Sequence, residues 1–78
     1  MFIEIKKAEY LNDYKIRLFF SNGEIKVVNL ESYLTGPIFE PLLDYDNFKN
    51  FSIPFNTIQW GNGADFAPEF LYGISTLE

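Results

Sequence analysis

The chain has 78 residues, of which 47% are hydrophobic and 19% aromatic, and its formal net charge is −5. It contains no cysteine and no histidine, which excludes disulfides, the usual zinc sites and catalysis by Ser-His-Asp or Cys-His groups. The acidic charge argues against direct nucleic-acid binding, and the lack of a long apolar run or a recognisable signal peptide argues against membrane contact.

Alternating apolar residues at the start of the chain predict two strands, over residues 2–10 and 14–20. A period of two residues is typical of strands that bury one face. Asn12 and Asp13 tolerate turn geometry, so we expect residues 11–14 to connect the two strands.

Asn22 and Gly23 form the strongest local hairpin signal, because a type I′ turn requires positive φ at both central residues. With these two residues as the turn, Phe20 faces Ile25. One face of the hairpin then consists of Ile16, Leu18, Phe20, Ile25 and Val27. Phe19 falls on the opposite, charged face, where it is a candidate for an exposed apolar contact.

The middle of the chain has the pattern of short helical segments. Residues 30–35 predict one helical turn, which Gly36 ends because glycine suits the position after a helix. Asp44 or Asp46 would cap a second short helix that continues to Phe51. A proline shortly after it limits the following strand to an edge of a sheet.

Another strand, turn and helix follow near the C-terminus. Residues 57–60 predict the strand, and Asn62 with Gly63 predicts the tight turn. Pro68 marks the first turn of the helix, where the carboxylate of Glu69 is favourable to the helix dipole.

We expect Asp65 to cap this helix, because Ala67, directly before the proline, cannot accept a capping hydrogen bond. Residues 74–78 form a tail that we expect to fray. The sequence shows no linker, repeat or low-complexity segment, so it predicts a single domain over residues 1–78.

Two groups of carboxylates resemble known kinds of functional site, one a calcium-binding loop and the other a catalytic acid–base pair. The stretch Asp44 to Asn47 is like the start of a calcium loop, but loop positions six and twelve hold Lys49 and Phe55 instead of Gly and Glu. Asp65 and Glu69 could act as an acid–base pair, or could simply satisfy the free N–H groups at a helix start. The structural interpretation is favoured at both, so we predict no catalytic, metal-binding or cofactor-binding residue.

Four motifs in a fixed order carry a family resemblance: the Asn-Gly-Glu of the hairpin, then residues 29–34, 36–42 and 60–72. The last has the form W-x-N-G-A-D-x-x-P-E-x-L-Y, which is specific. Over residues 2–73 the chain resembles the domain of unknown function 2442 family.

This resemblance implies a small bacterial or phage-borne α+β domain. Many such proteins lie beside a small partner protein, and the pair is often proposed to be a toxin–antitoxin system with this family as the antitoxin. No catalytic residues or cofactors are established for the family, and this chain lacks the helix-turn-helix that some members carry. Asn29 stands where the family usually has Asp, and Ala67 where it has Ser, Asp or a similar residue.

Aromatic residues supply the candidate interaction surface. Its members are Phe19, Trp60, Phe66, Phe70 and Tyr72. Exposed aromatic clusters often mark interfaces, but a small domain also needs large aromatic side chains in its core. Both alternatives stay open for the four C-terminal members.

The elements together predict an α+β fold, with an antiparallel sheet of four to five strands and short helices packed against it. We expect a non-enzymatic, cytoplasmic protein-interaction module without cofactors. By resemblance, it would be the antitoxin-like half of a two-protein system with a small basic partner. One alternative is a homo-oligomer that associates through an open strand edge, and another is a carboxylate enzyme that uses Asp65 and Glu69.

Overall fold

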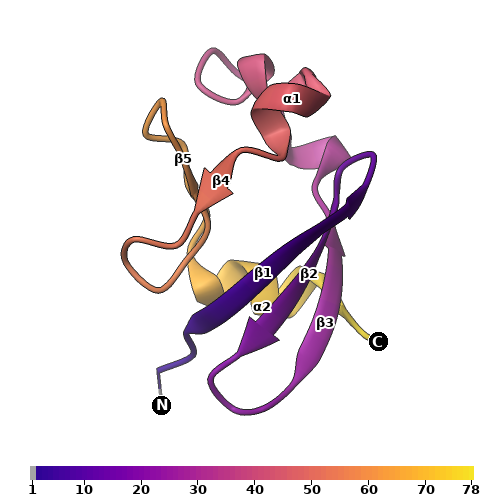
Figure 1. Ribbon diagram of the computed structural model, residues 1–78, viewed down its shortest axis with the longest axis vertical. Helices are drawn as coiled ribbons and strands as arrows, with labels where there is room; N and C mark the ends of the chain where they lie inside the picture. The colour runs from indigo at the N-terminus through magenta and orange to yellow at the C-terminus, as the bar shows by residue number, and fades with distance from the viewer. Residues whose placement is uncertain (1) are drawn as a thin grey trace.

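The computed structural model describes residues 2–78 (Figure 1). Its elements follow in the order β1 (Ile5–Asn12), β2 (Lys15–Phe20), β3 (Ile25–Asn29), η1 (Glu31–Tyr33), η2 (Glu40–Leu43), α1 (Tyr45–Phe48), β4 (Phe51–Ser52), β5 (Gln59–Trp60), α2 (Pro68–Ile74) and β6 (Thr76–Leu77), where η denotes a 3-10 helix. None of the helices in this described part of the chain is long and apolar enough to cross a membrane.

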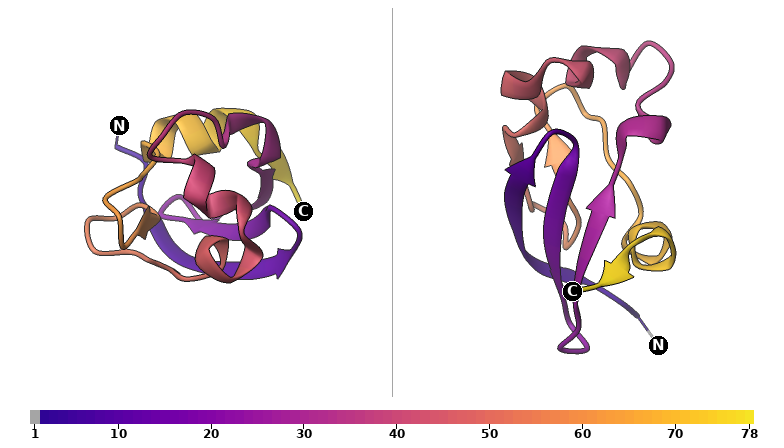
Figure 2. Two further views of the ribbon diagram at one scale, coloured as in Figure 1. Left: turned by 90° about the horizontal axis from the view of Figure 1, so that it is seen from above. Right: turned by 90° about the vertical axis from the view of Figure 1, so that its right-hand side faces the viewer.

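The strands form two antiparallel sheets. The larger sheet has the order β1-β2-β3-β6, and the smaller sheet pairs β4 with β5. α2 covers one face of the larger sheet, and the 3-10 helices gather with α1 at one end of the molecule (Figure 2). The predicted α+β fold, with a four-stranded antiparallel sheet and short helices, is therefore confirmed.

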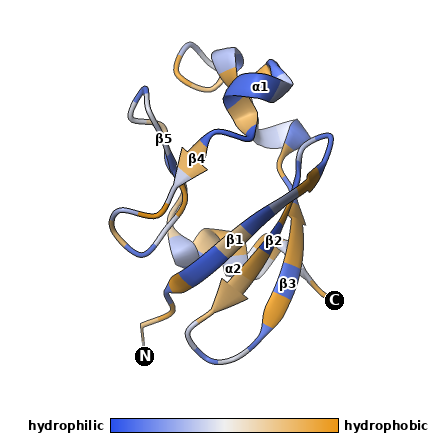
Figure 3. Ribbon diagram, viewed as in Figure 1, coloured by the Kyte–Doolittle hydropathy of each residue, from blue (hydrophilic) through white to orange (hydrophobic). Residues whose placement is uncertain are grey.

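The hydrophobic core lies on the inner face of the larger sheet, whose strands alternate between hydrophobic and hydrophilic segments (Figure 3). Its largest fully buried side chains are Phe48, Ile5, Ile16, Leu18, Leu30, Ile58, Leu71 and Val28. Trp60 joins them, and its indole Nε1–H donates to the carbonyl oxygen of Phe48 at 2.7 Å. A buried indole N–H needs such a partner, so this bond fixes β5 against the end of α1.

The hairpin between β2 and β3 differs from the sequence prediction by one residue. Phe19, rather than Phe20, lies opposite Ile25, because the loop contains residues 21–23 instead of two residues. Gly23 donates its N–H to the carbonyl oxygen of Phe20 at 3.0 Å. Gly23 has a φ of 88° and is the only loop residue with positive φ. The turn is therefore of the three-residue kind, with one left-handed glycine, and not a type I′ turn.

The one-residue difference reverses the two faces of β3. Lys26 lies opposite Leu18, and Val28 lies on the same inner face. Ile25 and Val27 point to the outer face of the sheet, so the prediction that placed them with the core was wrong. A side-chain period of two explains why a single extra loop residue exchanges the faces completely.

Lys26 tolerates the inner face because α2 supplies a partner for its ammonium group. The side chain is only 8% exposed. Its Nζ donates to the carbonyl oxygen of Tyr72 at 2.6 Å and lies 3.9 Å from the centroid of the Tyr72 ring. Carbonyl groups in the last turn of a helix lack intrahelical partners and carry partial negative charge, so they stabilise a cation.

The C-terminal residues are ordered against the sheet, which corrects the expectation that residues 74–78 fray. β6 pairs with β3, and Glu78 donates its N–H to the carbonyl oxygen of Ile25 at 3.2 Å. The Glu78 carboxylate also pairs with the guanidinium of Arg17, at 2.7 Å from Nη2 to Oε2. The partners that hold the tail therefore lie on strands that are distant in the sequence.

The two α-helices begin differently. Asp44 caps α1 by accepting a hydrogen bond from the N–H of Asp46 at 2.9 Å. At α2, Ala67 occupies the N-cap position and no side chain caps the helix, so the predicted capping role of Asp65 was wrong. Proline occupies the start of α2, where no N–H needs a partner, and Glu69 lies in its first turn.

Candidate interaction surface

The aromatic residues that the sequence predicts for an interaction surface do not form one surface cluster. Trp60 is 2% exposed and belongs to the core, so its inclusion was wrong. Phe19 lies on the outer face of the sheet, and Tyr72 lies near the end of α2 against the β2–β3 hairpin. Phe66 and Phe70 are neighbours, with their ring centroids 5.7 Å apart and their planes 17° from parallel.

A ladder of four aromatic rings runs from the surface toward the core beside α2. Tyr33 meets Phe70 edge to face at 5.3 Å. Phe70 stacks on Phe66, which stacks in turn on Phe39 at 4.8 Å. Phe70 is 39% exposed and Tyr33 is 37% exposed, while the other two rings pack against the core. We call these four residues the aromatic ladder.

Sequence reasoning missed Tyr33, which lies in the helical turn predicted over residues 30–35, and Phe39, which lies in a segment with no strand or helix periodicity. Gly36, with a φ of 86°, turns the chain there, and its carbonyl oxygen accepts a hydrogen bond from the N–H of Phe39 at 3.1 Å. The side-chain amide of Asn62 then donates to the carbonyl oxygen of Ile38 at 2.8 Å. Composition was the available signal, because both side chains are large and aromatic and the sequence patterns assigned neither of them to the core.

An open groove of about 850 Å³ lies next to the exposed end of the ladder, between η1, β3 and β6. Its lining mixes charged, polar and apolar side chains, namely Lys15, Val27, Asn29, Glu31, Ser32, Tyr33, Ile74 and Thr76. Asn29 accepts a hydrogen bond from the N–H of Glu31 at 3.0 Å. An amide oxygen therefore fixes the start of η1.

The net charge of the chain is concentrated on one part of it. Residues 30–74 contain a single basic residue, Lys49. Their six carboxylates are Glu31, Glu40, Asp44, Asp46, Asp65 and Glu69. The remaining residues contain five carboxylates and five basic side chains and are neutral. The aromatic ladder therefore lies in the segment that carries the whole net charge of −5.

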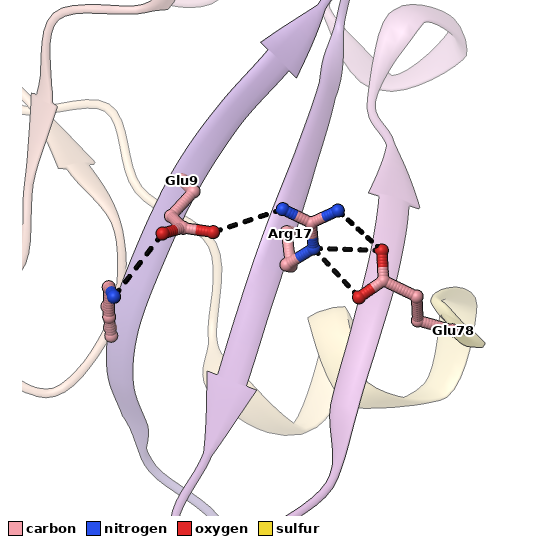
Figure 4. Close-up of polar contacts among 4 residues, drawn as sticks. Glu9, Arg17 and Glu78 are labelled. Atoms are coloured by element: carbon pink, nitrogen blue, oxygen red, sulfur yellow. Dashed lines mark hydrogen bonds and ion pairs between the residues drawn. The ribbon is translucent and has the colours of Figure 1, made fainter.

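Ion pairs on the outer face of the larger sheet join β1, β2 and the residue that follows β6 (Figure 4). Arg17 pairs with Glu9 at 3.1 Å and with Glu78 at 2.7 Å, and these hydrogen bonds hold the pKa of both carboxyl groups below their usual value. The Nζ of Lys7 lies 3.3 Å from Glu9 and 5.1 Å from the ring centroid of Phe19. The Phe19 ring is thus partly covered by an ammonium group. It is therefore a poorer candidate for an exposed apolar contact than the sequence suggests.

Tyr72 joins the β2–β3 hairpin to α2. Its hydroxyl donates to the carboxylate of Glu24 and accepts from the side-chain amide of Asn22 at 3.4 Å. The hydrogen bond to Glu24 raises the pKa of Tyr72. We call Asn22, Glu24, Lys26 and Tyr72 the hairpin–helix latch, because these side chains connect the loop and β3 to the last turn of the helix.

The carboxylates considered for chemistry are solvent-exposed. Asp65 forms an isolated backbone bridge with Gln59, and Glu69 projects from the first turn of α2. Neither side chain lines the groove. Residues 2–78 include no group of three or more Asp and Glu that could hold a metal ion.

Comparison with protein families matches residues 5–76 to the family described as "Protein of unknown function (DUF2442)". The match covers nearly the whole chain, including both Asn-Gly turns, the aromatic ladder and α2, and it confirms the resemblance carried by the sequence motifs. Neither a curated protein nor a solved structure matches the chain.

Proposed function

The chain belongs to the DUF2442 family, and on that premise we propose that it is a non-enzymatic protein-binding module whose partner is a small basic protein. The observation that supports this proposal most directly is the aromatic ladder, which lies in the one segment that carries net charge. The proposal concerns the side of the molecule formed by η1, α2 and the segment between η1 and η2.

The ladder has the properties of a binding hot spot. Phe70 and Tyr33 each leave more than a third of their surface exposed, yet both have a ring neighbour that fixes their position. Aromatic side chains with few free torsions contribute large contact areas at low entropic cost. Such residues dominate the binding energy of many protein interfaces.

The surrounding charge favours a basic partner. Glu31 lines the groove beside Tyr33, and Glu69 precedes Phe70 in α2. An arginine or lysine of a partner could therefore contact an aromatic face and a carboxylate at once, through cation–π and ionic attraction. The net charge of −5 would also accelerate association with a basic protein, and more strongly at low salt.

The specific form of this function that we propose is the antitoxin-like half of a two-protein toxin–antitoxin system. The family resemblance and the acidic aromatic surface support it. In this role the module would cover a basic surface of its partner, without itself transforming a substrate.

A pull-down of the tagged protein from its own cells, followed by mass spectrometry, tests the proposal. We expect one stoichiometric small basic protein, whose binding weakens as salt is raised. Phe70→Ala and Tyr33→Ala should each weaken binding at least tenfold, as expected for a hot-spot residue. Phe55→Ala is the matched control, because Phe55 is 79% exposed but lies outside the ladder. Equal loss in all three variants, or recovery of no basic protein, would contradict the proposal.

A further inference from the structure

We propose that β1 is a self-association edge, along which two copies of the chain pair their β1 strands antiparallel about a two-fold axis at Ala8. This inference is independent of the partner surface described above, because it uses the opposite, charge-balanced part of the molecule. It would join two four-stranded sheets into one continuous sheet, in the manner of strand addition at a free edge.

The outer edge of β1 is open over most of its length. β1 is the first strand in the sheet order and pairs only with β2 among the described residues. The view in the right panel of Figure 2 shows it at the border of the sheet. Ile5, at its start, donates its N–H to the carbonyl oxygen of Asn56 at 2.9 Å. Within the described part of the chain, no other backbone hydrogen bond outside the sheet involves residues 6–12.

Register shows which backbone groups of β1 face outward. Phe20 exchanges backbone hydrogen bonds with the loop on the β3 side. Because this direction alternates along a strand, the backbone groups of Phe19 and Arg17 point to β1. Their partners there are Lys7 and Glu9.

The backbone groups of Lys7 and Glu9 are therefore used within the chain. Those of Ala8 and Tyr10 point away from β2 and are free to pair with another strand. One-residue bulges lie at Lys6 and Leu11, since the register shifts on either side of the regular stretch. The regular part of the free edge is thus short and well defined.

Two-fold symmetry leaves three registers for this edge, and charge selects one of them. Pairing Tyr10 with Tyr10 of a second copy would place the Leu11 bulge inside the new ladder. Pairing Ala8 with Tyr10 of the second copy would place Glu9 directly opposite Glu9, which is unfavourable. Pairing Ala8 with Ala8 places Lys7 opposite Glu9 of the second copy, and symmetry repeats this favourable pair.

The distribution of charge is compatible with the close approach of two copies at this edge. The residues outside 30–74, which include the strands of the larger sheet and their loops, are neutral in sum, whereas the net negative charge resides in residues 30–74. Lys7 and Glu9 already lie 3.3 Å apart on the outer face, so both are present where a second copy would meet them. A contact made by one short strand is small, so we expect a dimer that forms and dissociates with concentration.

Cysteine crosslinking reports the register directly, because the natural chain contains no cysteine. Lys7→Cys and Glu9→Cys are purified separately, then mixed in a glutathione redox buffer. The selected register makes positions 7 and 9 a non-hydrogen-bonded pair, whose short Cα separation suits a disulfide. We expect the mixed heterodimer to be the main crosslinked species, which mass spectrometry distinguishes from either homodimer. A Glu9→Cys homodimer, a statistical mixture or no crosslink would overturn the proposal.

Sedimentation over a range of concentrations tests the charge argument without cysteines. Lys7→Glu and Glu9→Lys should each raise the dimer dissociation constant roughly tenfold, because each creates two like-charged pairs. The double variant Lys7→Glu/Glu9→Lys restores complementarity and should recover dimerisation. Lys15→Glu is the control for the charge change, since Lys15 lies on β2. A chain that stays monomeric at every concentration, or equal effects of the Lys7 and Lys15 changes, would refute the pairing.

Discussion

The two Asn-Gly turns of this chain, residues 20–24 and 60–64, share one backbone conformation but connect different parts of the fold. In both, the first residue donates its N–H to the carbonyl oxygen of the fifth at 2.9 Å. The glycines have φ angles of 88° and 89°. Each asparagine accepts a hydrogen bond from the N–H two residues further on, at 3.0 and 3.1 Å.

The side-chain amides of the two asparagines make the difference. Asn22 donates to the carboxylate of Glu24 at 2.8 Å and so takes part in the hairpin–helix latch. Asn62 instead donates to the carbonyl oxygen of Ile38, 24 residues away in the sequence, and holds the segment that carries Phe39 of the aromatic ladder. The local pattern therefore determines the shape of the turn, and the surrounding fold determines what the turn anchors.

The largest effect we expect comes from removing the asparagine side chains. Asn62→Ala loses the acceptor for the N–H of Ala64 and the bond to Ile38, so the free energy of unfolding should fall by about 2 kcal/mol. Asn22→Ala should cost about 1 kcal/mol, because water can reach the groups that it leaves. Urea unfolding of both variants measures the difference.

Asn62→Asp and Asn22→Asp are the matched variants for this comparison. Aspartate keeps the oxygen that accepts the backbone N–H but removes the donor of the amide. The Asn62 variant then faces the carbonyl oxygen of Ile38 with a carboxylate, whereas the Asn22 variant faces the carboxylate of Glu24 and adds a like charge, so added salt should reduce the stability loss at Asn22 more than the loss at Asn62. If added salt changes the two losses equally, the different partners of the two amides do not distinguish the turns.

A smaller and equal effect is expected at the two glycines. A Cβ added at Gly23 or Gly63 would meet nothing within 4 Å, so the cost of alanine is the strain of positive φ, about 1 kcal/mol. Gly61→Ala is the control, because Gly61 has equal space and no positive φ, and it should be neutral. Unequal costs at Gly23 and Gly63 in thermal or urea unfolding would show that the shared conformation is not energetically equivalent.

The same turns show what the sequence could and could not predict. Their positions, the strands beside the first turn and the start of α2 at Pro68 follow from local residue chemistry. The length of the first loop does not, because Asn-Gly is compatible with loops of two or three residues. The observed register requires a partner for Lys26, and that partner is the carbonyl oxygen of Tyr72, which is 46 residues away.

Similar reasoning explains the surface residues that were assigned wrongly or missed. Trp60, Phe66 and Phe70 are near in sequence and all aromatic, so their tertiary neighbours decide which of them is core and which is surface. Tyr33 reaches the surface ladder through contact with Phe70, and the ordered tail depends on Arg17. The position of each of these residues depends on a contact between segments that are distant in the sequence, and the periodicity of hydrophobic residues carries no information about such contacts.

The smallest effect we expect is a pH dependence that only the first turn has. The hydrogen bond to Glu24 raises the pKa of Tyr72 in the folded chain. The neutral phenol therefore contributes stability that is fully present below the unfolded pKa of about 10 and is lost as pH rises through the higher folded pKa. The difference in unfolding free energy between the natural chain and Tyr72→Phe should shrink between about pH 9 and pH 12.

Subtracting Tyr72→Phe from the natural chain at each pH cancels the contributions of the other tyrosines. This matters because burial also raises the pKa of Tyr14. The same subtraction with Asn62→Ala should give a difference that does not change with pH, because the second turn bonds to a backbone carbonyl oxygen and to no titratable side chain. If the difference in unfolding free energy between the natural chain and Tyr72→Phe also stays constant with pH, ionisation of the Tyr72 hydroxyl is not coupled to folding. The first turn would then be anchored by the Asn22 amide and the Lys26 ammonium alone, and the two turns would be equivalent in their response to pH.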